Sequence, residues 1–171
     1  KTASTGFSLA TEIADFLAKK QIPFSKAHEV AGECVKFCEK SGIELHEISD
    51  EQLQKMLACE FGGMNDALLN VYAITGNKKY LTTADRFYHK AIMDPLANQQ
   101  DQLSGKHSNT QIPKIIGAAR RFELTQDTKD KTISEFFWNT VVHNHTYVMG
   151  GNSEYEYLTE AGKLNNHLSQ N

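Results

Sequence analysis

Apolar residues recur at helical spacing along most of the chain, whereas the alternating pattern of strands is scarce. A Ser-x-x-Gln capping box, formed by Ser49 and Gln52, marks the start of one helix. Together with caps and stop signals, the pattern predicts helices over about 9–20, 25–41, 65–75, 77–92, 110–124 and 128–142, and a loop over 93–108. The sequence therefore predicts an all-α fold.

An internal repeat relates two of the predicted helical corners. Residues 72–79 align with residues 122–129, an offset of 50 residues. In both copies an apolar helix ends at a Thr, an Asn or Asp opens the next helix, and an aromatic residue closes it (Phe87 and Phe137). Such repeats predict stacked helical hairpins, in a solenoid or a closed ring. Because these folds need about three or more repeats, the working protein is expected to be longer than this chain.

Composition narrows the choice of partners. The hydrophobic fraction of 40% and the charged fraction of 23% are ordinary for a globular domain, and the net charge of −3 argues against nucleic acid or an anionic membrane. No apolar run approaches the roughly 20 residues that span a bilayer. Cys34, Cys38 and Cys59 form no CxxC pair, so reduced thiols and a cytoplasmic location are expected. His143 and His145 are a weak metal pair, and a structural role is favoured, so no metal ligands are predicted.

The first third of the chain carries one specific set of motifs. These are GFSLATEIADFL at 6–17, PF at 23–24 and AHEVAGECV at 27–35. With them, residues 5–53 resemble the C-terminal helical part of argininosuccinate lyase. The catalytic serine loop of that family lies outside the segment, so no lyase catalytic residue is carried over, and His28 is predicted to be structural. The resemblance implies a helical module that packs between subunits, and hence a possible homo-oligomer.

The rest of the chain carries a second set of motifs, in a consistent order. They are QKML at 54–57, EFGGMNDAL at 60–68, YAITG at 72–76, DPLA at 94–97, HSNTQIPK at 107–114, FFW at 136–138, GGNSE at 150–154 and GKLN at 162–165. With these blocks, residues 49–171 resemble β-L-arabinofuranosidase-type glycoside hydrolases, whose catalytic domain is an α/α toroid. The expected organisation is a lyase-like helical segment over 1–53, followed by helical hairpins of a partial α/α toroid over 54–171.

The resemblance implies a general acid/base at Glu156, with Glu154 as the fallback. Glycosidic cleavage generally needs a proton donor and a second group that acts as nucleophile or base. Members of the family usually have Gly immediately before the acidic residue, where this chain has Tyr155. This departure raises the question of which backbone conformation Tyr155 adopts. Without the resemblance, both carboxylates read equally well as solvated loop residues.

The resemblance also implies a carbohydrate-binding pocket. Its expected residues are His107, Asn109, Gln111, Asn152 and Glu60. Their side chains offer donors and acceptors for sugar hydroxyls. In the alternative interpretation, Asn109 or Thr110 simply caps a helix, and both roles are compatible. Many relatives have His where this chain has Phe61, so one sugar contact is expected to be missing.

Relatives continue beyond the GKLN block into a Glu-Thr-Cys motif and a later Cys pair. Those residues look like zinc ligands and a cysteine nucleophile. Zinc is therefore expected in the complete family domain, and no cofactor is expected from the residues of this chain. The chain as given is expected to be a catalytically inactive part of a glycoside hydrolase. The alternatives are a lyase-derived oligomerisation module, or a fused, chimeric or patchwork chain with no activity of its own.

Overall fold

A computed structural model describes residues 48–58 and 62–167, and it divides the chain into two units, Lys1–Leu53 and Gln54–Asn171. In the first unit, the described residues include the start of helix α3 (Asp50–Met56). The predicted capping box is present, because the Gln52 N–H donates to Ser49 Oγ at 3.2 Å and the Ser49 N–H donates to Gln52 Oε1 at 2.9 Å. Outside the described residues lie the predicted helices over 9–20 and 25–41, His28, Cys34, Cys38, Cys59, Glu60 and Phe61.

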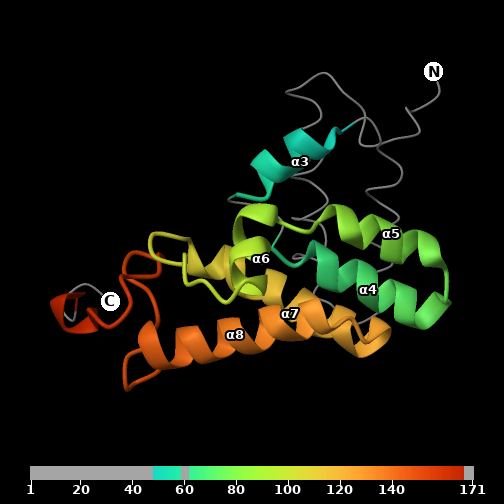
Figure 1. Ribbon diagram of the computed structural model, residues 1–171. Helices are drawn as coiled ribbons and strands as arrows, with labels where there is room; N and C mark the ends of the chain where they lie inside the picture. Colours follow the sequence, from blue (N-terminus) through green and yellow to red (C-terminus); the bar gives the residue numbers. More distant parts are fainter. Residues whose placement is uncertain (1–47, 59–61, 168–171) are drawn as a thin grey trace. The chain divides into compact units, whose positions relative to one another are not determined.

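The described part of the second unit is built from helices (Figure 1). In chain order they are α4 (Met64–Thr75), α5 (Lys78–Arg86), α6 (Lys90–Ala97), α7 (Ser108–Thr125), α8 (Thr128–Asn144) and the short 3-10 helix η2 (Leu164–His167). Over the described ranges two isolated β-bridges occur but no strand, which confirms the all-α prediction. None of the helices in these ranges is long and apolar enough to cross a membrane.

Two helical hairpins lie side by side in this unit. Helix α4 packs against α5 and α7, α7 packs against α8, and α6 packs against α8. The corners of the two hairpins have the same local structure, as the repeat predicts. Gly76 and Gln126 end α4 and α7 in the left-handed conformation, with φ of 66° and 61°. Asn77 and Asp127 then cap the next helix, each accepting a hydrogen bond of 3.0 Å from a backbone N–H two residues on.

The helix predicted over 77–92 is interrupted. Helix α5 ends at Arg86 and α6 begins at Lys90. The Gln54 side chain bridges this gap, because its amide donates to the Tyr88 carbonyl at 2.8 Å and its oxygen accepts from the Lys90 N–H at 2.9 Å. A residue distant in sequence thus satisfies the backbone groups that a continuous helix would have paired.

The loop predicted over 93–108 is wrong in its first part, because α6 continues to Ala97 with Pro95 inside it. Proline removes one helical hydrogen bond. Met93 and Leu96 are each 1% exposed, and burying two such side chains contributes about 3–6 kcal/mol. That gain offsets the roughly 3 kcal/mol that a proline inside a helix costs through the lost hydrogen bond and the clash with the carbonyl four residues earlier.

One hydrophobic core joins α6, α7 and α8 to two loops. Its buried members are Ile92, Met93, Leu96, Leu103, Ile115, Ala118, Ile133, Phe137, Val141 and Leu158. Leu103 and Leu158 belong to the loops that carry the candidate site. Fully buried His145 adds a polar link, because its Nδ1 lies 2.8 Å from the Thr159 carbonyl and its Nε2 lies 2.9 Å from Asp101 Oδ2. The core therefore holds both loops against the ends of the helices.

Candidate functional site

His107 and Glu156 meet at the start of α7. The Nε2 atom of His107 lies 3.1 Å from Glu156 Oε2, and its Nδ1 lies 2.9 Å from the Thr110 hydroxyl. The side chain of Glu156 is 67% exposed, and that of His107 is 27% exposed. A hydroxyl can either donate or accept, so Thr110 is compatible with either tautomer of His107. The imidazole can therefore donate to an ionised Glu156 carboxylate or accept from its protonated form.

Glu156 sits in a tight two-residue turn. The Glu154 N–H donates to the Tyr157 carbonyl at 2.8 Å, and the Tyr157 N–H donates to the Glu154 carbonyl at 2.9 Å. The two central residues, Tyr155 and Glu156, have φ of 48° and 71°. Left-handed backbone costs a non-glycine residue about 1–2 kcal/mol. Tyr155, at the position where the family usually has Gly, thus adopts the conformation that Gly favours.

The first residues of α7 hold this strained turn in place. The Glu156 carbonyl accepts from the Ser108 N–H at 2.8 Å and from its hydroxyl at 3.2 Å. His107 forms a β-bridge with Tyr157, and their rings pack edge to face with centroids 5.3 Å apart. Ser108 is 1% exposed, so the anchor is buried while the carboxylate of Glu156 faces solvent. Strained backbone persists where surrounding contacts fix it in this way, and such positions cluster at functional sites.

The remaining predicted sugar contacts differ in how far they are exposed to solvent. Asn109 is exposed in the first turn of α7, two residues from His107, where it suits a ligand contact. Asn152 is half-buried in the loop that follows α8. Gln111 is only 1% exposed, and its side-chain oxygen accepts from the Lys114 ammonium at 2.8 Å. The structure therefore brings together His107 and Glu156 and turns Gln111 toward the interior.

A buried polar cluster centred on Lys114 was not predicted from the sequence. This side chain is 1% exposed, donates to the Leu57 carbonyl, and has its ammonium 2.9 Å from His89 Nδ1. Burial and the charge of Lys114 lower the pKa of His89 to about 4, so at neutral pH its Nδ1 accepts. Helical spacing could have indicated this cluster, because polar Gln111 and Lys114 fall on the same face of α7 as apolar Ala118.

The described residues also bear on the zinc that the resemblance implies. Across 48–58 and 62–167, no group of three or more His, Cys, Asp or Glu side chains is placed to hold a metal ion. These described residues therefore offer no candidate zinc site.

Curated relatives match a short segment of the chain. The argininosuccinate lyase of Streptomyces clavuligerus is 60% identical over 50 residues, which are 29% of this chain and 11% of that protein. The argininosuccinate lyase of Streptomyces griseus subsp. griseus is 57% identical over 54 residues, or 32% and 11%. That of Thermobifida fusca is 53% identical over 51 residues, or 30% and 11%. The chain thus spans about a tenth of the length of these relatives.

A family match covers nearly the whole chain. The sequence model described as "Beta-L-arabinofuranosidase, GH127 catalytic domain" matches residues 7–171. The match includes the repeat, the His107 block and the turn that carries Glu156. It also extends across most of residues 5–53, the segment that resembles the lyase. The chain therefore belongs to the family of the β-L-arabinofuranosidase GH127 catalytic domain.

Proposed function

We propose that this chain carries the proton-transfer group and part of the sugar-binding surface of a glycoside hydrolase that acts on L-arabinofuranosides. The contact between His107 and Glu156 is the observation that carries the proposal. It combines a carboxyl group open to solvent with an imidazole that can exchange a proton with it. Family membership supports the reaction class, and resemblance to the β-L-arabinofuranosidases supports the sugar.

Glu156 acts as general acid and then as general base. In its protonated form it donates a proton to the oxygen of the leaving group as the glycosidic bond breaks and a nucleophile of the complete enzyme bonds to the anomeric carbon. The resulting carboxylate then accepts a proton from the water that displaces this nucleophile from the sugar. His107 stabilises the carboxylate by donating from Nε2, and the Thr110 hydroxyl beside Nδ1 accommodates the matching tautomer. The rigid turn keeps the carboxyl group in one place through both steps.

Asn109 and His107 are the proposed sugar contacts at the start of α7. Both lie in the same helical turn as the Ser108 anchor, so a sugar bound there would lie beside Glu156. Gln111 acts indirectly in this proposal, by holding Lys114 inside the helix packing. Asn152 and Glu60 remain sugar-contact predictions that rest on the resemblance.

Binding of methyl β-L-arabinofuranoside to the full chain tests this proposal. We expect saturable binding in titration calorimetry, weakened about tenfold by His107→Ala, which corresponds to about 1.4 kcal/mol. His143→Ala is the matched control, because His143 is an exposed histidine at the end of α8. Absence of binding, or equal weakening by both substitutions, would contradict the proposal.

A second candidate function rests on the lyase-like segment. Identity of 60% over 50 residues favours a helical module that packs between subunits. Light scattering on the full chain tests this second candidate function. A tetramer supports a module that packs between subunits, and a monomer counts against it. Sugar binding by a tetramer would show that the two functions coexist.

A further inference from the structure

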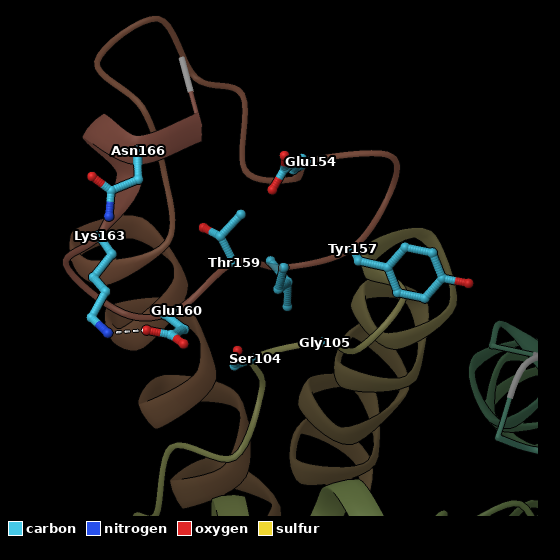
Figure 2. Close-up of a pocket in the computed structure, with 9 residues that line it drawn as sticks. Ser104, Gly105, Glu154, Tyr157, Thr159, Glu160, Lys163 and Asn166 are labelled. Atoms are coloured by element: carbon cyan, nitrogen blue, oxygen red, sulfur yellow. Dashed lines mark ion pairs between the residues drawn. The ribbon is translucent and has the colours of Figure 1, made fainter. Parts of the chain in front are cut away.

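A short ladder of hydrogen bonds joins the loop before α7 to the loop that carries Glu156. The Gly105 N–H donates to the Leu158 carbonyl at 2.8 Å, and the Leu158 N–H donates to the Lys106 carbonyl at 2.9 Å. The bond from the Ser108 N–H to the Glu156 carbonyl continues the ladder. Figure 2 shows the two loops side by side at Gly105. The position of the Glu156 backbone therefore depends on how these loops are held together.

The side chains of Asp101 and His145 fasten one end of this ladder. His145 directly follows α8 and is fully buried, at 0% exposure. Its Nδ1 lies 2.8 Å from the Thr159 carbonyl, in the loop that carries Glu156. Its Nε2 lies 2.9 Å from Asp101 Oδ2, while Asp101 Oδ1 accepts from the Leu103 N–H at 3.1 Å. One imidazole ring thus ties the two loops to each other and to the end of α8.

The partners of this ring require a hydrogen on each side of it. A carbonyl oxygen only accepts, so Nδ1 carries a hydrogen and donates to Thr159. An ionised carboxylate also only accepts, and a bare Nε2 at 2.9 Å from it would place two lone pairs against each other. A hydrogen therefore lies between Nε2 and Oδ2, bonded either to the imidazole or to the carboxyl group. In both arrangements the charges of Asp101 and His145 sum to zero, which suits a fully buried ring.

The charged groups that neighbour the ring along the chain lie at the surface. Glu160, next to Thr159, is exposed and forms an ion pair with Lys163 (Figure 2). His143, two residues before His145, is exposed as well. Among the contacts of the described residues, the carboxyl group of Asp101 is the charged group that meets the ring.

We propose that Asp101 and His145 are positioning residues for Glu156, and that the proton held between them keeps the two loops joined. Without that proton Nε2 and Oδ2 repel each other, and the loop that contains Thr159 loses its tie to the loop that contains Asp101. The role in placing Glu156 rests on the proposed function, whereas the tie itself is measurable without any sugar.

Two substitutions of Asp101 separate the proton from the turn around it. Asp101→Ser keeps an oxygen that can accept from the Leu103 N–H, as serine does in similar turns, but removes the group that reaches His145. Asp101→Asn keeps that acceptor and supplies an amide N–H that donates to Nε2 in place of the proton. The two variants therefore differ in the hydrogen bond to the ring.

Hydrogen exchange of the full chain, followed by NMR at neutral pH, measures how firmly the ladder is held. In Asp101→Ser the backbone amides of Ser108 and Leu158 should exchange about tenfold faster than in the wild type. The amides of Gly76 and Gln126, at the distant helical corners, should keep their rates because they open locally. Asp101→Asn should restore the wild-type rates of the ladder amides.

The imidazole of His145 gives a second signature. In Asp101→Asn its nitrogen-15 chemical shifts should show a hydrogen on Nδ1 and none on Nε2, because the new amide donates to Nε2. A hydrogen on Nε2 alone would overturn the proposal. Wild-type exchange of the ladder amides in Asp101→Ser would also overturn it, as would an Asp101→Asn variant that exchanges as fast as Asp101→Ser. Absence of methyl β-L-arabinofuranoside binding by the wild type would instead contradict the proposed function and leave the tie between the loops standing.

Discussion

The two helical corners of the repeat share a backbone but differ in what anchors them. At each corner a threonine hydroxyl donates to the carbonyl four residues earlier, from Thr75 to Val71 and from Thr125 to Arg121, both at 2.8 Å. A left-handed residue and a capping side chain then turn the chain into the next helix. Because all these contacts are local, similar sequences build similar corners 50 residues apart.

The anchors are different because the same position carries different chemistry. Val71 in the first copy is buried, whereas Arg121 in the second donates to three carboxylates. The distances are 2.9 Å to Asp85, 3.0 Å to Asp127 and 2.5 Å to Asp130. The first corner is therefore held by apolar packing, and the second by ion pairs that reach into the neighbouring hairpin. Local sequence sets the shape of a corner, and tertiary partners set how firmly it is held.

Arg121→Ala should produce the largest effect, a loss of about 3 kcal/mol in the free energy of unfolding. It leaves the Asp130 carboxylate, whose side chain is 5% exposed, without its cationic partner. Burial already raises the pKa of Asp130 despite the hydrogen bond from Arg121. Urea denaturation measures the loss. Arg120→Ala is the control, because Arg120 pairs with exposed Glu123 and donates to the Asn70 side chain at 3.0 Å but leaves no buried charge behind, and it should cost about 1 kcal/mol. Equal losses would show that the second corner does not depend on the buried pair.

Gly117→Ala should cost about 2 kcal/mol, through crowding at the crossing of α4 and α7. A Cβ at Gly117 would lie 2.2 Å from side-chain atoms of Asn65, whose amide donates to the Lys114 carbonyl at 2.9 Å. In the first copy of the repeat the equivalent position is Ala67, so α4 and α7 differ at this position too. Thermal unfolding compares this variant with Gly63→Ala, where the nearest atom outside its neighbours is 3.9 Å away. A Gly117→Ala protein as stable as that control would contradict the close crossing.

Exchanging the residues at the two left-handed positions should change stability by about 1 kcal/mol in opposite directions. Gly76→Gln should destabilise the protein, because the new side chain has open space but a strained backbone. Gln126→Gly should stabilise it by releasing the same strain, since the Gln126 side chain makes exposed hydrogen bonds of 3.2 Å and 3.4 Å. Denaturant midpoints give both values, and effects of the same sign would refute the equivalence of the corners.

Asp127→Asn should have the smallest effect, about 0.5 kcal/mol at neutral pH, because Asp and Asn are similar caps and differ in charge. The Lys129 N–H, and then Arg121, hold the pKa of Asp127 below its ordinary value of 3.8. The carboxylate therefore adds stability above about pH 4, and this contribution is lost as pH falls through the lowered pKa. Unfolding measured between pH 7 and pH 2 should show the gap to wild type closing in acid. Asn77→Asp should introduce a dependence of the same sign at the first corner, and a gap that widens in acid would contradict the assignment.

The candidate site was less predictable than the corners. Resemblance singled out both His107 and Glu156, yet their contact joins residues 49 positions apart and depends on the turn at Tyr155. No local rule predicts two adjacent non-glycine residues with positive φ, because their conformation is strained and survives only with the Ser108 anchor. The sugar contact at Gln111 stays a prediction, and the register of α7 places this side chain against Lys114 with only 1% of it exposed.

The sequence by itself determined the helical class, the capping box at Ser49 and the repeated corners. These features depend on hydrogen bonds that span at most five residues, so the information for each lies within one short segment. Tertiary structure decided the break between α5 and α6, which the distant Gln54 side chain bridges. It also decided the meeting of His107 with Glu156. Such features depend on which segments pack together, and that is settled by burial of apolar surface across the whole unit.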